Sequence, residues 1–199
     1  MRRPLDIRLN PSHDLADPAV LEWVLAEIAA GGVAWVWLSP PCWSHSVVQN
    51  GHKGGQLRSN AFPEGVPPLH PDCVLGNKLW DAALTIFEFA VKSNLFAFVE
   101  HPWTAYSWKC ARTKSAEQLA GVERIRVDMC NFAECDEKRT LKPTGILTNA
   151  PWLKFLTRRC TKDHVHAAHL CGKRAKDAAS YSPLFCSSLA AAYAAWSKV

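Results

Sequence analysis

Apolar side chains recur at helical spacing near the start of the chain and predict its first helix. Asp17-Pro18 has the features of a helix start, with Asp17 as N-cap and Pro18 in the first turn. The apolar positions that follow at intervals of three and four are Val20, Leu21, Val24, Leu25 and Ile28. Gly31-Gly32 then ends the predicted helix.

Two uninterrupted apolar runs predict strands that are buried on both faces of a parallel sheet. The first covers 33–38 and ends at Ser39-Pro40-Pro41-Cys42, and the second covers 96–99 and ends at Glu100-His101-Pro102. A predicted helix over 77–93 separates them. This order is typical of a doubly wound α/β sheet, in which ligands bind at the carboxyl ends of the strands. We therefore expect the two polar turns to lie side by side.

The remaining pattern is weaker. Residues 43–76 are rich in Gly, Pro, His, Asn and Ser and predict a long loop, which in a compact domain is often functional. The later elements that we expect are strands over 123–129 and 145–148, a short basic helix over 151–160 and an alanine-rich helix over 182–196. We expect 1–150 to form the α/β core and 151–199 to add a basic Cys/His segment and a closing helix to the same domain.

Composition narrows the class of protein. With 199 residues, 48% hydrophobic and 21% charged, the chain is long enough for one domain with a real core and is too apolar for a disordered protein. No apolar run approaches the roughly 18 residues of a membrane span, and no secretory signal is recognisable, so we expect an intracellular protein that does not enter a membrane. Its eight cysteines then indicate free thiols, metal ligands or a nucleophile rather than a disulfide framework.

Charge is divided unevenly along the chain. Residues 1–99 carry seven Lys/Arg and nine Asp/Glu, whereas 100–199 carry sixteen and nine. The asymmetry favours a second half that faces a polyanion, although a solvated basic surface explains it equally simply.

Two residues in the predicted turns have the chemistry of a catalytic pair. Cys42 follows two prolines at the end of a strand, where a thiol with a lowered pKa would be a nucleophile. Glu100 follows the next strand, where a carboxyl group suits general acid catalysis or hydrogen bonding to an amino group. The simpler alternatives are an inert buried cysteine and a surface glutamate beside a turn.

Together, the two turns resemble the catalytic core of the cytosine-C5 DNA methyltransferases. That family has Pro-Cys-x-x-x-Ser, matched by Pro41, Cys42 and Ser46, and then Glu-Asn-Val or Glu-Asn-Pro, against Glu100-His101-Pro102. The weaker part of the resemblance covers Asp6-Ile7, His13-Asp14-Leu15, Leu57-Arg58, Asn131-Phe132-Ala133, Lys138-Arg139 and Lys142-Pro143-Thr144.

The resemblance implies a Rossmann-like fold, DNA as partner and S-adenosylmethionine as cofactor. Cys42 would add to C6 of a flipped-out cytosine while Glu100 would protonate or hydrogen-bond its N3 and exocyclic amine. The cofactor-binding residues implied are Asp6, Asp14 and Pro41. The substrate-binding residues implied are Ser46, Arg58, His101, Lys142 and Thr144, of which Arg58 and Lys142 would contact phosphate.

Three departures from the family pattern matter. The family's Asn is His101 here, so an imidazole would have to remake the hydrogen bond that fixes the Pro-Cys turn, and the family's Gln is Trp43. The first strand and its glycine-rich turn, which cradle the methionine part of the cofactor, are absent, and Gly31-Gly32 cannot replace them because it follows a helix. The alternatives are a complementing subunit or upstream segment, or a catalytically inactive nucleic-acid-binding remnant.

A second constellation has the composition of a zinc site. The Cys/His-dense part of the chain contains Cys130, Cys135, Cys160, His164, His166, His169 and Cys171. The spacings Cys130-x4-Cys135 and His164-x4-His169 approach ligand spacings without fitting a standard zinc finger. These four are the zinc candidates, and separate buried thiols and surface histidines are the alternative, with no metal bound.

Overall fold

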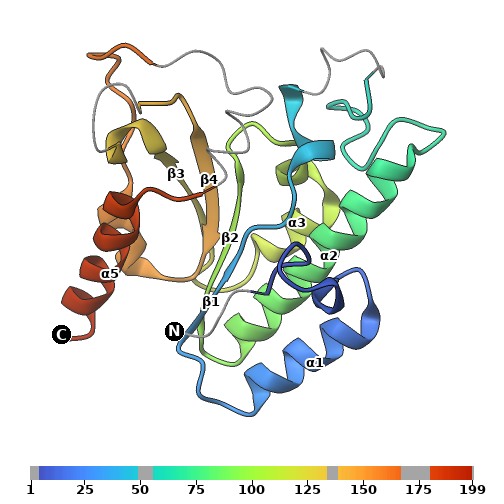
Figure 1. Ribbon diagram of the computed structural model, residues 1–199, viewed down its shortest axis with the longest axis horizontal. Coiled ribbons are helices and arrows are strands. Elements are labelled where there is room, and N and C mark those ends of the chain that lie inside the picture. Colours follow the sequence, from blue (N-terminus) through green and yellow to red (C-terminus); the bar gives the residue numbers. More distant parts are fainter. Residues whose placement is uncertain (1–4, 49–55, 134–138, 167–179, 199) are drawn as a thin grey trace.

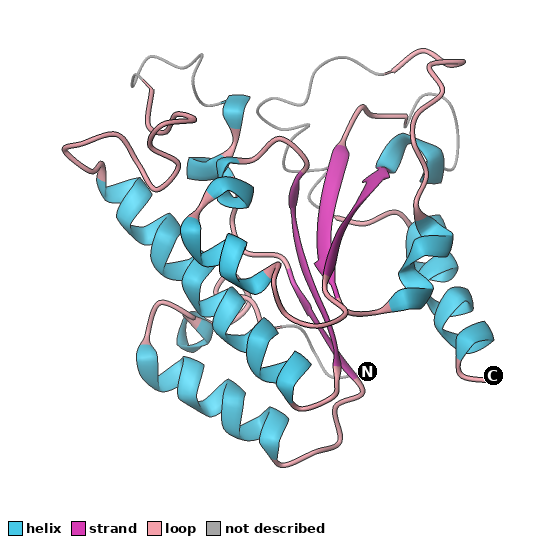
Figure 2. Cartoon of the chain, turned by 180° about the vertical axis from the view of Figure 1, so that it is seen from behind, coloured by secondary structure: helices cyan, strands magenta, loops and turns pink. Residues whose placement is uncertain are grey.

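The computed structural model describes residues 5–48, 56–133, 139–166 and 180–198. It is an α/β fold with a central four-stranded sheet and helices on both faces (Figures 1 and 2). Helices α1 (Pro18–Ala29), α2 (Pro71–Lys92) and α3 (Ala111–Ala116) lie on one side, and α5 (Pro183–Trp196) lies on the other. The layers confirm the α/β class.

The sheet is mixed, which corrects the expectation of a doubly wound parallel sheet. Its strands, in the order β1-β2-β4-β3, are β1 (Trp35–Leu38), β2 (Phe96–Pro102), β4 (Pro143–Thr148) and β3 (Glu123–Asp128). Only β1 and β2 are parallel, and β4 pairs antiparallel with both β2 and β3. The helical crossover through α2 makes the first pair parallel, as expected. The sheet is compatible with a Rossmann-like fold without establishing one.

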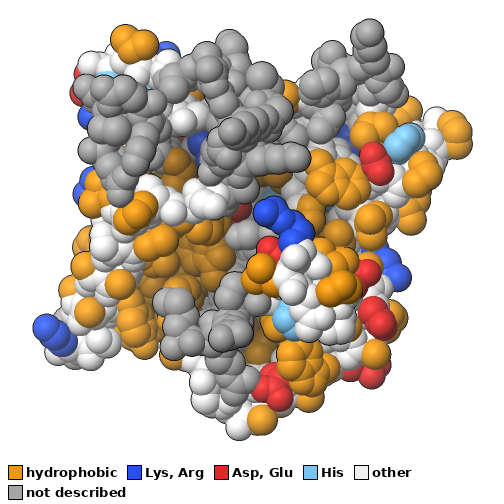
Figure 3. Space-filling model, in the orientation of Figure 1, with side chains coloured by type: hydrophobic (Ala, Val, Ile, Leu, Met, Phe, Trp, Pro, Cys, Tyr) orange, Lys and Arg blue, Asp and Glu red, His pale blue; other side chains and the backbone are white. Residues whose placement is uncertain are grey.

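Strand β1 forms an edge of the sheet. All four of its residues are only partly buried, so the prediction of a strand buried on both faces is wrong. The apolar run does form a strand. Its composition does not show, however, whether the strand has a neighbouring strand on each side or lies at the edge of the sheet. Figure 3 shows apolar side chains gathered on the face of the molecule that carries β1 and α5, and Trp35 and Trp37 belong to the cluster there.

The helix caps explain where α1 and α2 begin. The Asp17 carboxylate accepts a hydrogen bond from the Ala19 amide, which confirms the predicted start of α1. Helix α2 starts six residues before the predicted position, because the His70 ring caps the Asp72 amide and Pro71 occupies the first turn. The long loop predicted over 43–76 therefore ends before Pro71, and residues 49–55 within it lie outside the described part of the chain.

Strand β2 is longer than predicted, and this changes the setting of Glu100. The ladder with β4 pairs Glu100 with Ile146 and continues to Pro102. Glu100 therefore lies within the carboxyl-terminal half of the strand, and not in a turn after it.

Alternation along β2 places its side chains in two separate cores. Ala97 and Val99 pack toward α2, in a cluster that includes Trp80 and Phe87. Phe98 packs on the opposite face, in the cluster under α5 that includes Trp152 and Phe185. Among the described residues, no helix combines the length and apolarity needed to cross a membrane.

Candidate functional site

The candidate site lies where the parallel strands β1 and β2 end side by side (Figure 1). Pro40 and Pro41 lead from β1 to Cys42, which is the N-cap of a short 3₁₀ helix over Trp43–His45. The Cys42 carbonyl accepts hydrogen bonds from the His45 and Ser46 amides at 3.0 and 2.9 Å, so the cysteine begins a hydrogen-bonded turn. The predicted juxtaposition of the Cys42 turn with the end of β2 is therefore present.

His101 fixes this turn to the end of β2. Its Nε2 lies 3.0 Å from the Pro40 carbonyl oxygen and its Nδ1 lies 2.7 Å from Ser107 Oγ. Burial lowers the pKa of His101 to about 3, so the ring is neutral. Since a carbonyl only accepts, Nε2 carries the proton and Nδ1 accepts from the Ser107 hydroxyl. The imidazole thus ties down the Pro-Cys turn, and its full burial separates it from any substrate.

The pKa of Cys42 and the pKa of Glu100 are both shifted by burial and by Lys142. Burial raises the pKa of the Cys42 thiol, the Glu100 charge raises it further, and Lys142 opposes both effects. Burial likewise raises the pKa of Glu100, and Lys142 and Tyr181 oppose that shift. Burial and Glu100 thus disfavour the Cys42 thiolate, whereas the sequence had suggested a thiol with a lowered pKa. Activation of Cys42 consequently needs a group that accepts its proton.

Tyr181 belongs to the site and was missed by sequence reasoning. Its hydroxyl lies 2.8 Å from Ser39 Oγ, accepts from Trp37 Nε1 at 2.9 Å, and acts on the pKa of the Glu100 carboxyl group. Burial and the Glu100 charge raise the pKa of this phenol, so it stays protonated. In the sequence, Tyr181 is marked only by its position directly before the Ser182-Pro183 helix start. That position does not indicate which residues its hydroxyl contacts.

Two residues expected to touch substrate are fully buried. The Arg58 guanidinium donates to the carbonyl oxygens of Ser44, Pro63 and Cys73 and to the side-chain oxygens of Ser44 and Asn77. Thr144 lies within β4, and its hydroxyl donates to the Lys142 carbonyl at 3.3 Å. This geometry favours structural roles for Arg58 and Thr144 over the contacts that the resemblance implied. Ser46 and Lys142, by contrast, are partly exposed near Cys42.

Two of the residues expected to hold S-adenosylmethionine, Asp6 and Asp14, each cap a turn of their own. Asp6 Oδ1 accepts the Arg8 amide and Asp14 Oδ1 accepts the Ala16 amide, so each carboxylate stabilises its own turn. The surface hollow in this region includes neither carboxylate; its lining is Ser12, His13, Ala19, Val20 and Trp23. Pro41 is exposed in the turn that leads to Cys42. No strand among the described residues leads into a glycine-rich turn, so the fit to this cofactor is incomplete.

A second cluster of reactive side chains lies at the far end of β3. Cys130, Cys160, His164 and His166 bring one ligand atom each to within 4.8 Å of one another. Two of the four zinc candidates, Cys130 and His164, are thus in the cluster, whereas Cys135 and His169 lie outside the described residues. Cys160 and His166 were noted only as part of the Cys/His-dense stretch. Their spacing, Cys-x3-His-x-His, signalled ligands but not which cysteine would complete the set.

Comparison with known proteins places the chain in no family. No family model, curated protein or solved structure matches it.

Proposed function

We propose that the chain is a DNA (cytosine-5)-methyltransferase-type protein whose described residues activate the cytosine ring, with Cys42 as nucleophile and Glu100 as proton donor. The observation that carries the proposal is the placement of Cys42 and Glu100 at the carboxyl ends of two adjacent parallel strands, where Glu100 acts on the pKa of the Cys42 thiol. The motif resemblance at Pro41-Cys42 and Glu100 supports the same assignment.

The proposed chemistry moves the thiol proton to the base by way of Glu100. A cytosine flipped out of the duplex exposes C6 to the thiol and N3 to the carboxyl group. Glu100 donates its proton to N3 and regains one from Cys42 as the sulfur bonds to C6. The net result is that the thiol proton ends on N3, the C5–C6 double bond is saturated at C6, and C5 becomes an enamine carbon that attacks electrophiles. A raised pKa of Glu100 suits this role, because a carboxylate that is already ionised could not donate.

Lys142 and Tyr181 would adjust this proton transfer. The Lys142 ammonium opposes the rise in the pKa of both acids, so it stabilises the thiolate as it forms. The Tyr181 hydroxyl opposes the rise in the pKa of Glu100 and would stabilise the carboxylate between its two proton transfers. S-adenosylmethionine would supply the methyl group in such a reaction, but the described residues lack the turn that cradles it, and we assign them no methyl-transfer step.

Exchange of the C5 hydrogen of cytosine tests the proposal without the cofactor. Addition of Cys42 to C6 lets C5 take up a solvent proton and lose its original hydrogen before the C6–S bond breaks. We expect the protein to release tritium from DNA that carries [5-³H]cytosine, and Cys42→Ala to reduce the release to the buffer rate. Cys186→Ala is the matched control, because Cys186 is an exposed thiol on α5.

Two results would overturn the proposal. One is an absence of tritium release from both single-stranded and duplex DNA, which would favour the inactive nucleic-acid-binding alternative. The other is release that survives in Cys42→Ala and falls in Cys186→Ala, which would show adventitious addition of a surface thiol.

A further inference from the structure

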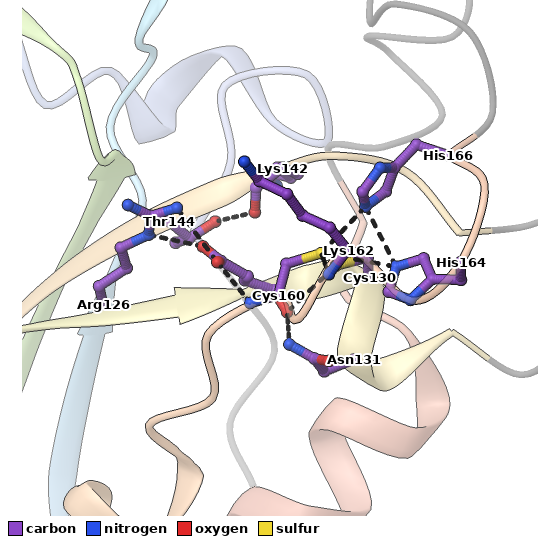
Figure 4. A network of polar contacts seen from close by, with 10 residues as sticks. Arg126, Cys130, Asn131, Lys142, Thr144, Cys160, Lys162, His164 and His166 are labelled. Atoms are coloured by element: carbon purple, nitrogen blue, oxygen red, sulfur yellow. Dashed lines mark hydrogen bonds and ion pairs between the residues drawn. The ribbon is translucent and has the colours of Figure 1, made fainter.

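Four ligand side chains come together from two segments that are about 30 positions apart in the sequence (Figure 4). Cys130 lies on the 3₁₀ helix Met129–Phe132, directly after β3. Cys160, His164 and His166 lie on the segment that follows the 3₁₀ helix Pro151–Leu156. The cluster is therefore a junction between the sheet and the chain that leads toward α5.

Backbone contacts fix the two segments to each other. The Asp128 amide donates to the Arg158 carbonyl at 2.9 Å, and the Cys160 amide donates to the Asp128 carboxylate at 2.8 Å. Asp128 is itself buried and bonded to the Arg126 guanidinium at 2.7 Å. These contacts place Cys160 beside Cys130 without any help from the ligand atoms.

The distances among three of the four ligand atoms fit a tetrahedral zinc site. Cys160 Sγ lies 3.7 Å from His164 Nε2 and 3.4 Å from His166 Nε2, and the two Nε2 atoms are 3.1 Å apart. With bonds of about 2.3 Å to sulfur and about 2.05 Å to nitrogen, a tetrahedron has S–N edges of about 3.6 Å and N–N edges of about 3.3 Å. The three distances among Cys160, His164 and His166 therefore agree with the tetrahedron to within about 0.2 Å, and Cys130 Sγ lies within 4.8 Å of all three ligand atoms.

The surroundings of the cluster support metal binding. His164 Nδ1 lies 2.7 Å from Asp163 Oδ1, so a carboxylate orients the ring and directs Nε2 toward the other ligands. The Lys162 amide lies 3.4 Å from Cys160 Sγ and can donate to a thiolate. Lys162 itself has φ +62, a left-handed conformation that is uncommon for a non-glycine residue and that turns the chain back toward the cysteine. Without a cation, two ring nitrogens 3.1 Å apart would have to share one proton or repel each other.

We propose that Cys130, Cys160, His164 and His166 bind one Zn²⁺ ion in a closed, structural Cys₂His₂ site. The site is structural because four protein ligands leave no position for water or substrate. It is independent of the chemistry proposed for Cys42 and stands even if that chemistry is absent.

Metal content and cobalt spectroscopy test the site on the full chain. We expect one zinc per chain by elemental analysis after purification without chelator. We also expect the Co²⁺-substituted protein to show the visible absorption of tetrahedral cobalt and sulfur-to-cobalt charge transfer from two thiolates. His166→Ala and Cys160→Ala should each lower the zinc content at least five-fold, whereas Cys186→Ala and Cys73→Ala, which change thiols outside the cluster, should retain one zinc.

The same measurements separate this ligand set from the one that sequence spacing suggested. Cys135→Ala and His169→Ala should keep one zinc per chain, and loss of zinc in these variants with retention in His166→Ala would refute the assignment. A metal-free protein as purified that also fails to bind added Zn²⁺ or Co²⁺ would refute it too. So would a mass 2 Da lower than that of the reduced chain, with Cys130 and Cys160 joined as a disulfide. The cobalt spectrum of the unmutated protein keeps the test valid if a ligand variant fails to fold.

Discussion

Replacement of Arg58 gives the sharpest test of how the loop that carries Cys42 is held. Its guanidinium is fully buried and makes five hydrogen bonds, three of them to backbone carbonyls. Burial lowers the pKa of Arg58, which reflects the cost of removing a charge from water. The role expected from the resemblance, a contact with DNA phosphate, would instead need the guanidinium at the surface.

The expected loss of stability follows from the number of acceptors left without a donor. Hydrogen bonds from a charged group are worth about 1.5–3 kcal/mol each, but the desolvation of the guanidinium offsets much of their sum. Removal of one member of a buried charged network typically costs about 3–5 kcal/mol, which we expect for Arg58→Ala. Arg58→Lys keeps the charge but offers at most three donors, so two acceptors are orphaned and we expect a loss of about 2–4 kcal/mol.

Urea unfolding followed by tryptophan fluorescence measures these losses. For a slope of about 2 kcal/mol per molar urea, Arg58→Ala should lower the midpoint by about 1.5–2.5 M. The control is Arg112→Ala, which breaks a partly exposed ion pair with Glu88 and should cost about 1 kcal/mol or less. If Arg58→Ala leaves the midpoint within about 0.3 M of wild type while DNA affinity falls, the network is not structural and the phosphate contact is supported.

Three further variants test neighbouring parts of the site. Gly76→Ala would place a Cβ 2.1 Å from Ser44 Oγ, so we expect a lower urea midpoint; Ala82→Gly in the same helix is the control for helix propensity, and an unchanged midpoint in Gly76→Ala would contradict the packing. Because the pKa of Glu100 is raised by burial, the folded protein loses stability as pH rises above about 4.5. We therefore expect Glu100→Gln to be more stable than the wild type at pH 8 and to lose tritium release. A variant that is less stable than the wild type at pH 8 would contradict the burial argument. Because burial lowers the pKa of His101 to about 3, the free energy of unfolding falls as pH drops below about 6.5. In unfolding measured from pH 6 to 4, His101→Asn should reduce the slope of that free energy against pH by about 1.4 kcal/mol per pH unit. An unchanged slope would show that His101 is protonated in the folded state.

Local signals in the sequence predicted the parts of the fold that depend on a few neighbouring residues. The start of α1 at Asp17-Pro18 was correct because a cap and its helix lie within three positions. The parallel pairing of β1 and β2 followed from the crossover helix between them. The order of the other two strands was not predictable in this way, because β4 inserts between β2 and β3 through pairing between segments far apart in the sequence.

The same distinction between local and long-range contacts applies to the residues of the candidate sites. Cys42 and Glu100 could be proposed from the sequence because each follows an apolar run with a reactive side chain. Tyr181 was not found, since its hydroxyl meets Ser39 across 142 positions and nothing near Tyr181 indicates that contact. In the metal cluster, the ligands at 160, 164 and 166 share one short segment, but the identity of the fourth ligand depends on how that segment pairs with the end of β3.

The two candidate sites are joined structurally through the 3₁₀ helix Met129–Phe132. Lys142, whose charge acts on both Cys42 and Glu100, receives the Met129 amide on its carbonyl at 3.1 Å, and Met129 directly precedes the ligand Cys130. Tyr181 contacts the same site from the residues that precede α5. The hydroxyl of the neighbouring Ser182 donates to the Phe132 carbonyl at 2.6 Å. The 3₁₀ helix Met129–Phe132 is thus held by the metal cluster at one end and by the start of α5 at the other. A bound zinc would stabilise this helix in place, and with it the Lys142 and Tyr181 groups that balance the charge of the thiol and the carboxyl.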